Sequence, residues 1–193
     1  MTLGQIKEAT CSTSANAARF LDAINNACTQ FNIDTPVRQL CFLAQTGHES
    51  GGLFYTEELA SGAAYEGRKS LGNVQKGDGV RFKGRGLIQI TGRANYKAVG
   101  DALGVDFVKN PPLLGGKNVN NCSADQLKYA ALSAAWFWKS RKLNDLADLI
   151  DISKPIDSGN NLVNYQAITK KINGGYNGLN DRLNRYKAGV KYF

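Results

Sequence analysis

The sequence lacks a long apolar run, because no uncharged apolar segment approaches the length of a membrane span. The first ten residues hold Lys7 and Glu8 but not the apolar segment of a secretory signal. We therefore expect synthesis in the cytoplasm, with another route of release for any action outside it. Apolar residues make up 42% of the chain and charged residues 21%, which indicates a globular protein. For 193 residues we expect one domain, residues 1–193, without a separate binding module.

Histidine and paired cysteines are also scarce. The chain has one histidine and four cysteines without a CxxC pair, namely Cys11, Cys28, Cys41 and Cys122. A zinc site needs about four closely spaced ligands, so this inventory argues against one. Four cysteines could form two disulfides, but without a secretory signal we expect reduced, buried cysteines. We expect no metal and no other cofactor.

Positive charge is in excess, with 24 Lys and Arg against 16 Asp and Glu, a net charge of +8. A positive field concentrates polyanions, so nucleic acid, anionic lipid and bacterial cell wall are candidate partners, with solubility alone as the alternative. No nucleic-acid-binding motif is present, and we expect no nucleic-acid partner.

The spacing of apolar residues predicts a predominantly α-helical α+β protein. We expect a short strand or hairpin over Val80–Thr91, where apolar residues alternate in part. The helix from Leu127 to Lys139 is apolar on nearly all sides, which predicts that it is the central buried helix. Helices are expected at residues 14–31, 36–49, 92–103, 127–139, 143–151 and 160–172, followed by a basic amphipathic segment from Leu179.

Two glutamates lie close to a predicted helix end. Gly51-Gly52 should stop the helix that begins at Pro36, so Glu49 lies at its C-terminus, where the helix dipole favours the protonated carboxyl. Glu58 follows nine residues later. Glycoside hydrolysis needs two such groups, one as proton donor and one as ionised base. The pair is therefore a candidate for glycosidase chemistry, with charged, solvated surface as the alternative that the two residues alone leave open.

Spacing alone leaves the second carboxyl group open. Glu57 and Glu58 are adjacent and should point in different directions, and Glu66 is a weaker third candidate. The hydroxyl of Thr91 could orient water in a cleft or cap the helix that follows it. His48 shares a helix face with buried residues, which favours a packed, orienting role.

Several stretches occur in the same order as in a known family. They are Phe42–Gly52, Phe82–Thr91, Asn95-Tyr96 and Ile172–Gly175, followed by Asp181-Arg182. These motifs resemble glycoside hydrolase family 19, which contains chitinases and phage endolysins. The resemblance implies a lysozyme-like helical fold with a small β-hairpin region, a cleft between two lobes, and an inverting, metal-free mechanism.

The resemblance also implies roles for individual residues. Glu49 matches the general acid, Glu58 the general base of bacterial members, and Thr91 the hydroxyl residue that holds the attacking water. Asn177 departs from some chitinases, which have glutamate there, so the chitinase cleft need not be preserved in detail. Sugar-binding or cleft-organising positions are matched by Gln89, Asn95, Tyr96, Asn173 and Arg182, and His48 is grouped with them.

The compact length, positive charge and motif set together predict a monomeric phage-type endolysin that hydrolyses β-1,4 bonds of peptidoglycan glycan strands. By resemblance it would be made in the host bacterial cytoplasm and reach the wall after holin-type release. The alternatives are a chitinase, a non-catalytic wall-binding phage module and a nucleic-acid binder. The basic C-terminal segment is expected to be a solvated face, with weak contact to anionic membrane or wall as its functional alternative: Lys170, Lys171, Arg182, Arg185, Lys187 and Lys191.

Overall fold

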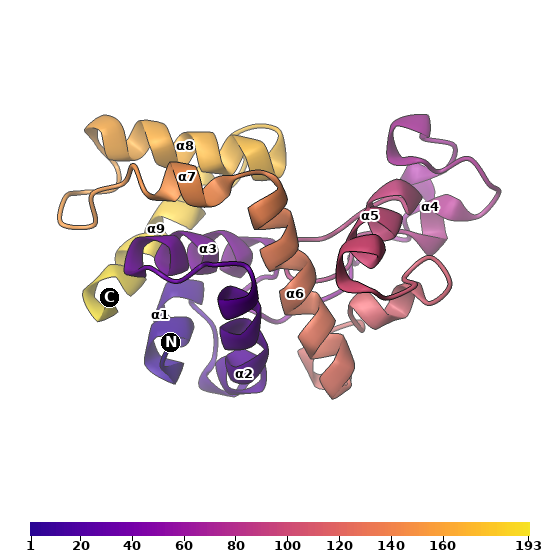
Figure 1. Ribbon diagram of the computed structural model, residues 1–193, viewed down its shortest axis with the longest axis horizontal. Helices are drawn as coiled ribbons and strands as arrows, with labels where there is room; N and C mark the ends of the chain where they lie inside the picture. The colour runs from indigo at the N-terminus through magenta and orange to yellow at the C-terminus, as the bar shows by residue number, and fades with distance from the viewer.

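The computed structural model describes residues 1–193 and is built almost entirely from helices (Figure 1). None of them combines the length and the apolar character of a membrane span. The α-helices are α1 (Leu3–Thr10), α2 (Ser14–Gln30), α3 (Pro36–Glu49), α4 (Asp78–Arg81), α5 (Arg93–Leu103), α6 (Ala124–Ser140), α7 (Leu143–Ala147), α8 (Gly159–Asn173) and α9 (Leu179–Gly189). Short 3-10 helices are η1 (Ala63–Tyr65), η2 (Lys69–Leu71), η3 (Pro111–Leu114), η4 (Val119–Asn121) and η5 (Val190–Tyr192).

Four of the nine α-helices, namely α1, α2, α3 and α6, begin at a residue whose side chain accepts a backbone N–H of the first turn. Thr35 accepts a hydrogen bond from the backbone N–H of Arg38, and Pro36 occupies the first turn of α3. Ser123 and Gln126 form a complete capping box at the start of α6. The start at Pro36 was predicted from the sequence, whereas α6 begins three residues before the expected Leu127. The sequence did not predict α1, which begins with a similar box between Thr2 and Gln5.

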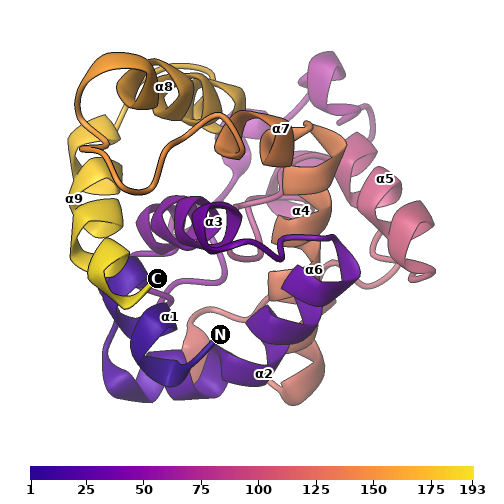
Figure 2. The ribbon, with the colours of Figure 1, turned by 60° about the vertical axis from the view of Figure 1, so that its left-hand side comes forward.

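The central helix is α3, and the prediction that the helix over 127–139 holds this place is wrong. Figure 2 shows α3 in the middle of a ring of other helices, and residues 40–47 of α3 are buried without interruption. α6 is apolar on nearly all sides for another reason: it packs against α2 on one side and against α5 and η3 on the other. Its Trp138 is fully buried and meets Phe42 of α3 edge to face at 5.6 Å.

The molecule has two parts, which Figure 1 shows on either side of α6. We call the part made of α1–α3 and α7–α9 the large lobe, and the part around α4, α5, η1 and η2 the small lobe. The chain passes from the large lobe to the small lobe directly after α3. The two predicted glutamates flank this passage, since Glu49 ends α3 and Glu58 pairs with Gly84 in the small lobe.

The expected strand over Val80–Thr91 is not formed. α4 occupies its beginning, and the remainder makes only isolated antiparallel bridges, between Glu57 and Arg85 and between Arg85 and Ile90. The backbone has positive φ at Gly86 (81°) and Gln89 (57°), so the chain turns back on itself where a strand would continue. The apolar residues there serve the core instead, since Leu87 is 0% exposed and Ile88 7% exposed.

Candidate active site

Glu49 is held by a buried arginine from the other end of the chain. Nη2 of Arg182 on α9 lies 2.5 Å from Oε1 of Glu49, and Arg182 is only 1% exposed. The Glu49 side chain keeps 19% of its surface open. The guanidinium therefore contacts the inner oxygen of the carboxyl group from inside the protein, while part of Glu49 stays accessible to a ligand.

A chain of buried hydrogen bonds fixes that arginine. Nη1 of Arg182 donates to Oε1 of Gln45 at 2.5 Å, and Nε2 of Gln45 donates to the hydroxyl of Thr169 on α8 at 3.0 Å. Gln45 and Thr169 are both 0% exposed. Because buried polar groups are costly to leave unpaired, this chain ties α3, α8 and α9 into one arrangement around Glu49.

The last turn of α3 rests on α1. A Cβ atom at Gly47 would lie 2.7 Å from Cα of Thr10, so only glycine allows this approach. Beyond Glu49 the backbone has positive φ at Gly51 (58°), Gly52 (72°) and Leu53 (59°). Two glycines and one strained leucine thus turn the chain sharply toward the small lobe directly after the carboxyl group.

His48 is packed rather than free, as its sequence position suggested. Its Nδ1 lies 2.7 Å from Oδ2 of Asp181, and Gly178 leaves room for the imidazole ring. Nε of Arg185 reaches the same carboxylate oxygen at 2.6 Å. Burial works to raise the pKa of Asp181, but Arg185 and then His48 outweigh it and hold that pKa below its usual value. α9 therefore braces both residues of the His48-Glu49 pair.

Glu58 is oriented by two donors in the small lobe. The hydroxyl of Tyr65 donates to Oε1 of Glu58 at 2.9 Å, and the backbone N–H of Gly84 donates to Oε2 at 3.1 Å. Burial, followed by the bond to Glu58, raises the pKa of Tyr65 above its ordinary value, so the phenol remains a donor. The Glu58 side chain is half-buried, which leaves it able to meet a ligand.

The adjacent glutamate has a different task. Glu57 forms ion pairs with Lys83 and Arg85, each at 2.8 Å. Burial would raise the pKa of Glu57, but these two cations outweigh it and hold that pKa below its usual range. The carboxylate of Glu66 accepts the backbone N–H groups of Gly77 and Gly79. Glu57 is thus paired with two cations, and Glu66 is bound on both carboxylate oxygens to the backbone of its own lobe. Glu58 has no cationic partner and is not used to hold a loop in this way.

Gln89 joins Glu58 against Gly84. A Cβ atom on Gly84 would lie 2.8 Å from Oε1 of Gln89 and 3.3 Å from Oε2 of Glu58. Thr91 donates its hydroxyl to the backbone oxygen of Gln89 at 2.9 Å, and Asn95 donates to the backbone oxygen of Thr91 at 2.7 Å. Thr91 does not cap the next helix, because α5 begins after Gly92 without a side-chain cap. Hydrogen bonds thus connect Thr91 and Asn95 to the backbone of Gln89, whose side chain meets Glu58 at Gly84.

Two of the residues matched to sugar-binding or cleft-organising positions, Tyr96 and Arg182, are buried. Tyr96 is 0% exposed, and its hydroxyl donates to the backbone oxygen of Lys83 at 2.6 Å while accepting from Arg85. Burial raises its pKa far above the ordinary value. Arg182 acts on Glu49 from within the core, as described. Both residues organise the site, whereas Asn173, at the end of α8, is exposed.

The expectation of a solvated basic C-terminal face is wrong for its central residues. Arg182 lies in the core, and Arg185 binds both Asp181 and the backbone oxygen of Thr10. Lys187 is exposed and pairs with Asp157 at 2.6 Å. The Asp181–Arg185 spacing of four residues was the one local signal of this arrangement. The contacts to α1 and α3 had no signal in the sequence.

The cysteines are all free, as expected from the sequence, but they are not all buried. Cys28, Cys41 and Cys122 are buried, and Cys11 is exposed at the end of α1. Burial raises the pKa of the Cys28 thiol to about 12, so it stays protonated and unreactive.

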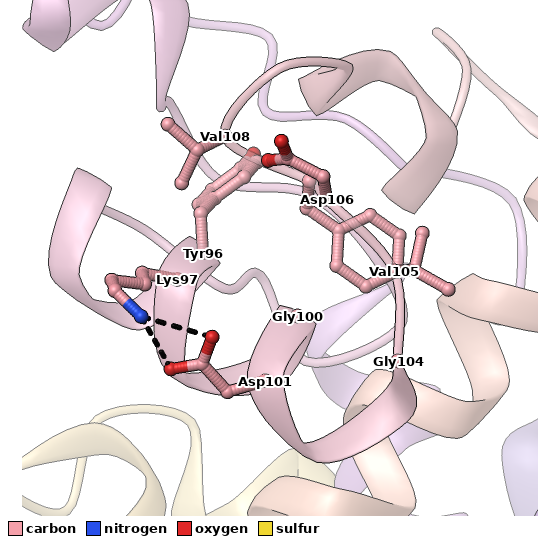
Figure 3. A pocket seen from close by; sticks show the side chains of 9 residues that line it. Tyr96, Lys97, Gly100, Asp101, Gly104, Val105, Asp106 and Val108 are labelled. Atoms are coloured by element: carbon pink, nitrogen blue, oxygen red, sulfur yellow. Dashed lines mark hydrogen bonds and ion pairs between the residues drawn. The ribbon is translucent and has the colours of Figure 1, made fainter.

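A hollow of about 450 Å³ lies beside α5, away from both glutamates (Figure 3). Its rim carries an exposed ion pair between Lys97 and Asp101, with Nζ 2.6 Å from Oδ2. Val105 and Val108 contribute apolar surface. Both carboxylates of the hollow are engaged, since Asp101 pairs with Lys97 and Asp106 accepts the backbone N–H of Lys109.

Comparison with known proteins identifies the family. The sequence model for glycosyl hydrolase family 19, described as chitinase class I, matches residues 13–190. A Haemophilus influenzae protein described as a glycosyl hydrolase family 19 domain-containing protein is 30% identical over 183 residues, which cover 79% of this chain and 78% of that protein. The acidic 27 kDa endochitinase of Solanum lycopersicum is 35% identical over 142 residues, or 69% of this chain and 51% of the plant protein. The chain thus spans about half the length of that endochitinase.

Solved structures show the same fold. Chitinase C from Streptomyces griseus superposes with a TM-score of 0.67 at 22% identity, covering 98% of this chain and 90% of that one. A bacterial family 19 chitinase superposes with a TM-score of 0.61 at 24% identity. The lysozyme-like helical fold expected from the motifs is therefore confirmed. The family model, the Haemophilus relative and the fold agree that this chain belongs to glycoside hydrolase family 19 and is a glycoside hydrolase.

Proposed function

We propose that this enzyme hydrolyses the β-1,4 glycosidic bonds of bacterial peptidoglycan by an inverting acid/base mechanism, as an endolysin does. The observation that carries the mechanism is the pair of unlike carboxyl groups. Glu49 projects from the large lobe beside a guanidinium, and Glu58 from the small lobe between a phenol and an amide N–H. Separate acid and base roles require two carboxyl groups in different surroundings, and the match to the family's motifs assigns the acid role to Glu49 and the base role to Glu58.

In this mechanism Glu49 donates a proton to the glycosidic oxygen as its bond to the sugar breaks. Glu58 accepts a proton from a water molecule that attacks the anomeric carbon from the opposite face, which inverts its configuration. Gln89, whose side chain lies with Glu58 against Gly84, and Thr91, whose hydroxyl binds the backbone oxygen of Gln89, supply hydrogen-bonding groups that position the water and the sugar. Arg182 keeps Glu49 in a fixed orientation throughout.

The choice of peptidoglycan rests on charge. The chain carries a net charge of +8, and peptidoglycan strands carry carboxylates on their peptides, whereas chitin is neutral. The bacterial relative is covered over 78% of its length, against 51% for the tomato endochitinase. Chitin is the second candidate, favoured by the endochitinases among the relatives, since both polymers contain β-1,4-linked N-acetyl sugars.

Product analysis tests the substrate directly. Purified peptidoglycan and chitin oligomers are digested in parallel, and the fragments are reduced with borohydride and identified by mass spectrometry. We expect reduced N-acetyl sugar ends from peptidoglycan, and the reduced sugar identifies the bond that is cut. Release of sugar from chitin alone would refute the peptidoglycan assignment and establish the second candidate.

Glu58→Gln and Glu57→Gln test the assignment of the base. We expect Glu58→Gln to reduce turnover by about 10²- to 10⁴-fold, because glutamine cannot accept the proton from water. Glu57→Gln should keep its activity per folded molecule but lower the free energy of unfolding, since it weakens the ion pairs to Lys83 and Arg85. Steady-state kinetics and denaturant unfolding of both variants provide the measurement. Full activity in Glu58→Gln together with loss in Glu57→Gln would reverse the assignment.

A further inference from the structure

Next to Glu58 lies a cation that the mechanism does not use. The guanidinium carbon of Arg68 stands 5.3 Å from the centre of the Tyr65 ring, and the hydroxyl of that ring binds Glu58 at 2.9 Å. Arg68 is exposed and takes part in none of the ion pairs of the structure. One aromatic ring therefore separates an unpaired positive charge from Glu58.

The loop that carries Arg68 is anchored on both sides of it. On one side, Glu66 accepts the backbone N–H groups of Gly77 at 2.6 Å and Gly79 at 2.8 Å. On the other side, Asn73 donates to the backbone oxygen of Tyr65 and accepts from the backbone N–H of Arg93, both at 2.9 Å. Stacking on Tyr65 restricts the arginine further. A group held in this way loses little conformational freedom when a ligand binds.

The neighbouring cations are already engaged. Lys83 and Arg85 share the single carboxylate of Glu57, and their side chains are only 16% and 8% exposed, so neither charged group is free to turn toward a ligand at Glu58. Arg68 is the remaining guanidinium at this place, and guanidinium groups bind carboxylates through two parallel hydrogen bonds. An anionic group on the substrate, close to the sugar that meets Glu58, would find its partner here.

On the basis of the proposed peptidoglycan activity, we propose that Arg68 binds a carboxylate on a side group of the glycan strand and is a specificity-determining residue for an acidic substrate. In peptidoglycan, alternate sugars carry a lactyl ether extended by a peptide with free carboxylates. Chitin has no such group. Arg68 would thus add affinity for one polymer and none for the other.

Kinetics of Arg68→Gln on two forms of one polymer test this assignment. Native peptidoglycan is compared with peptidoglycan whose carboxylates have been converted to amides. We expect Arg68→Gln to lower kcat/KM about tenfold on the native polymer and to leave it unchanged on the amidated polymer. The wild type should lose a similar factor on amidation, and Arg68→Lys should recover part of it.

Arg141→Gln is the matched control, because Arg141 is also exposed and stacks on an aromatic ring, with its guanidinium carbon 3.9 Å from the centre of Phe137. It should behave like the wild type on both polymers. An equal loss of Arg68→Gln on both polymers would show that Arg68 acts through Tyr65 and Glu58, and no loss on either would show that it is idle. Both results overturn the inference while leaving the proposed function intact. Failure of the wild type to cleave either polymer would refute the proposed function itself.

Discussion

Glu49→Gln is expected to fold and to lose about 10²- to 10⁴-fold in turnover of the glycan substrate, because the amide has no proton to give to the leaving oxygen. The variant should also unfold more easily. Arg182 is 1% exposed and would keep only neutral acceptors, Gln45 and the new amide. We expect a loss of about 1–3 kcal/mol in the free energy of unfolding. Activity must therefore be expressed per folded molecule, with denaturant unfolding as the companion measurement.

Asp78→Asn is the matched control for that loss of stability. Asp78 is 1% exposed and pairs with Arg93 at 2.5 Å, so it provides a comparable buried carboxylate–guanidinium contact in the small lobe. The bond to Arg93 lowers the pKa of Asp78, which shows that the pair favours the charged form. Asp78→Asn should lose stability but keep its turnover. If Glu49→Gln hydrolysed glycan at the wild-type rate, the acid would have to be another residue.

Arg182→Ala should have the largest effect on stability of any single substitution considered. It would remove the partner of Glu49 and of Gln45 at once and leave a carboxylate without its counter-charge. Breaking a buried ion pair in this way costs about 3–5 kcal/mol. We also expect turnover to fall at temperatures where the variant is folded, because Glu49 loses the contact that orients it. Thermal unfolding and single-temperature kinetics measure the two effects.

Arg182→Lys and Arg185→Gln test whether the losses in Arg182→Ala come from its guanidinium contacts or from removing any arginine of α9. Lysine keeps the charge but cannot reach Gln45 and Glu49 together as the planar guanidinium does, so we expect partial recovery. Arg185→Gln removes a neighbouring arginine that contacts Asp181 and Thr10 but not Glu49. It should lower stability with less effect on turnover. An Arg182→Ala variant as stable as the wild type would contradict the role given to the buried hydrogen-bond chain.

Local signals were sufficient to predict the helix that carries Glu49, the proposed acid. Thr35 and Pro36 start α3, Gly51-Gly52 ends it, and Glu49 lies at the predicted helix end. The same holds for α6, whose capping box is visible in the sequence. The strand over Val80–Thr91 was predicted wrongly because apolar alternation does not reveal the positive φ at Gln89. The helix over 127–139 was predicted to be central because it is apolar on nearly all sides. Its apolar surface instead packs against elements on either side of it, which the sequence does not distinguish from burial at the centre.

The partners of the site residues could not be predicted, because they are far apart in the chain. Arg182 meets Glu49 across 133 positions, and Gln45 meets Thr169 across 124. The choice between Glu57 and Glu58 likewise depended on the ion pairs of Glu57 with Lys83 and Arg85, which lie 26 and 28 residues further along the chain. Family resemblance favoured Glu58 beforehand. The ion pairs of Glu57 give a physical reason for that preference.

The dependence of Glu49 on α9 also bears on when the enzyme is competent. A partly folded chain with α1–α3 in place would have Glu49, the proposed proton donor, without the arginine that contacts it, so we expect such a chain to be inert toward glycan. Transient detachment of α9 would remove Arg182 from Glu49 in the same way, while the small lobe and Glu58 stayed folded. The proposed hydrolytic activity therefore requires the complete tertiary structure, because the individual helices do not bring Arg182 and Glu49 together.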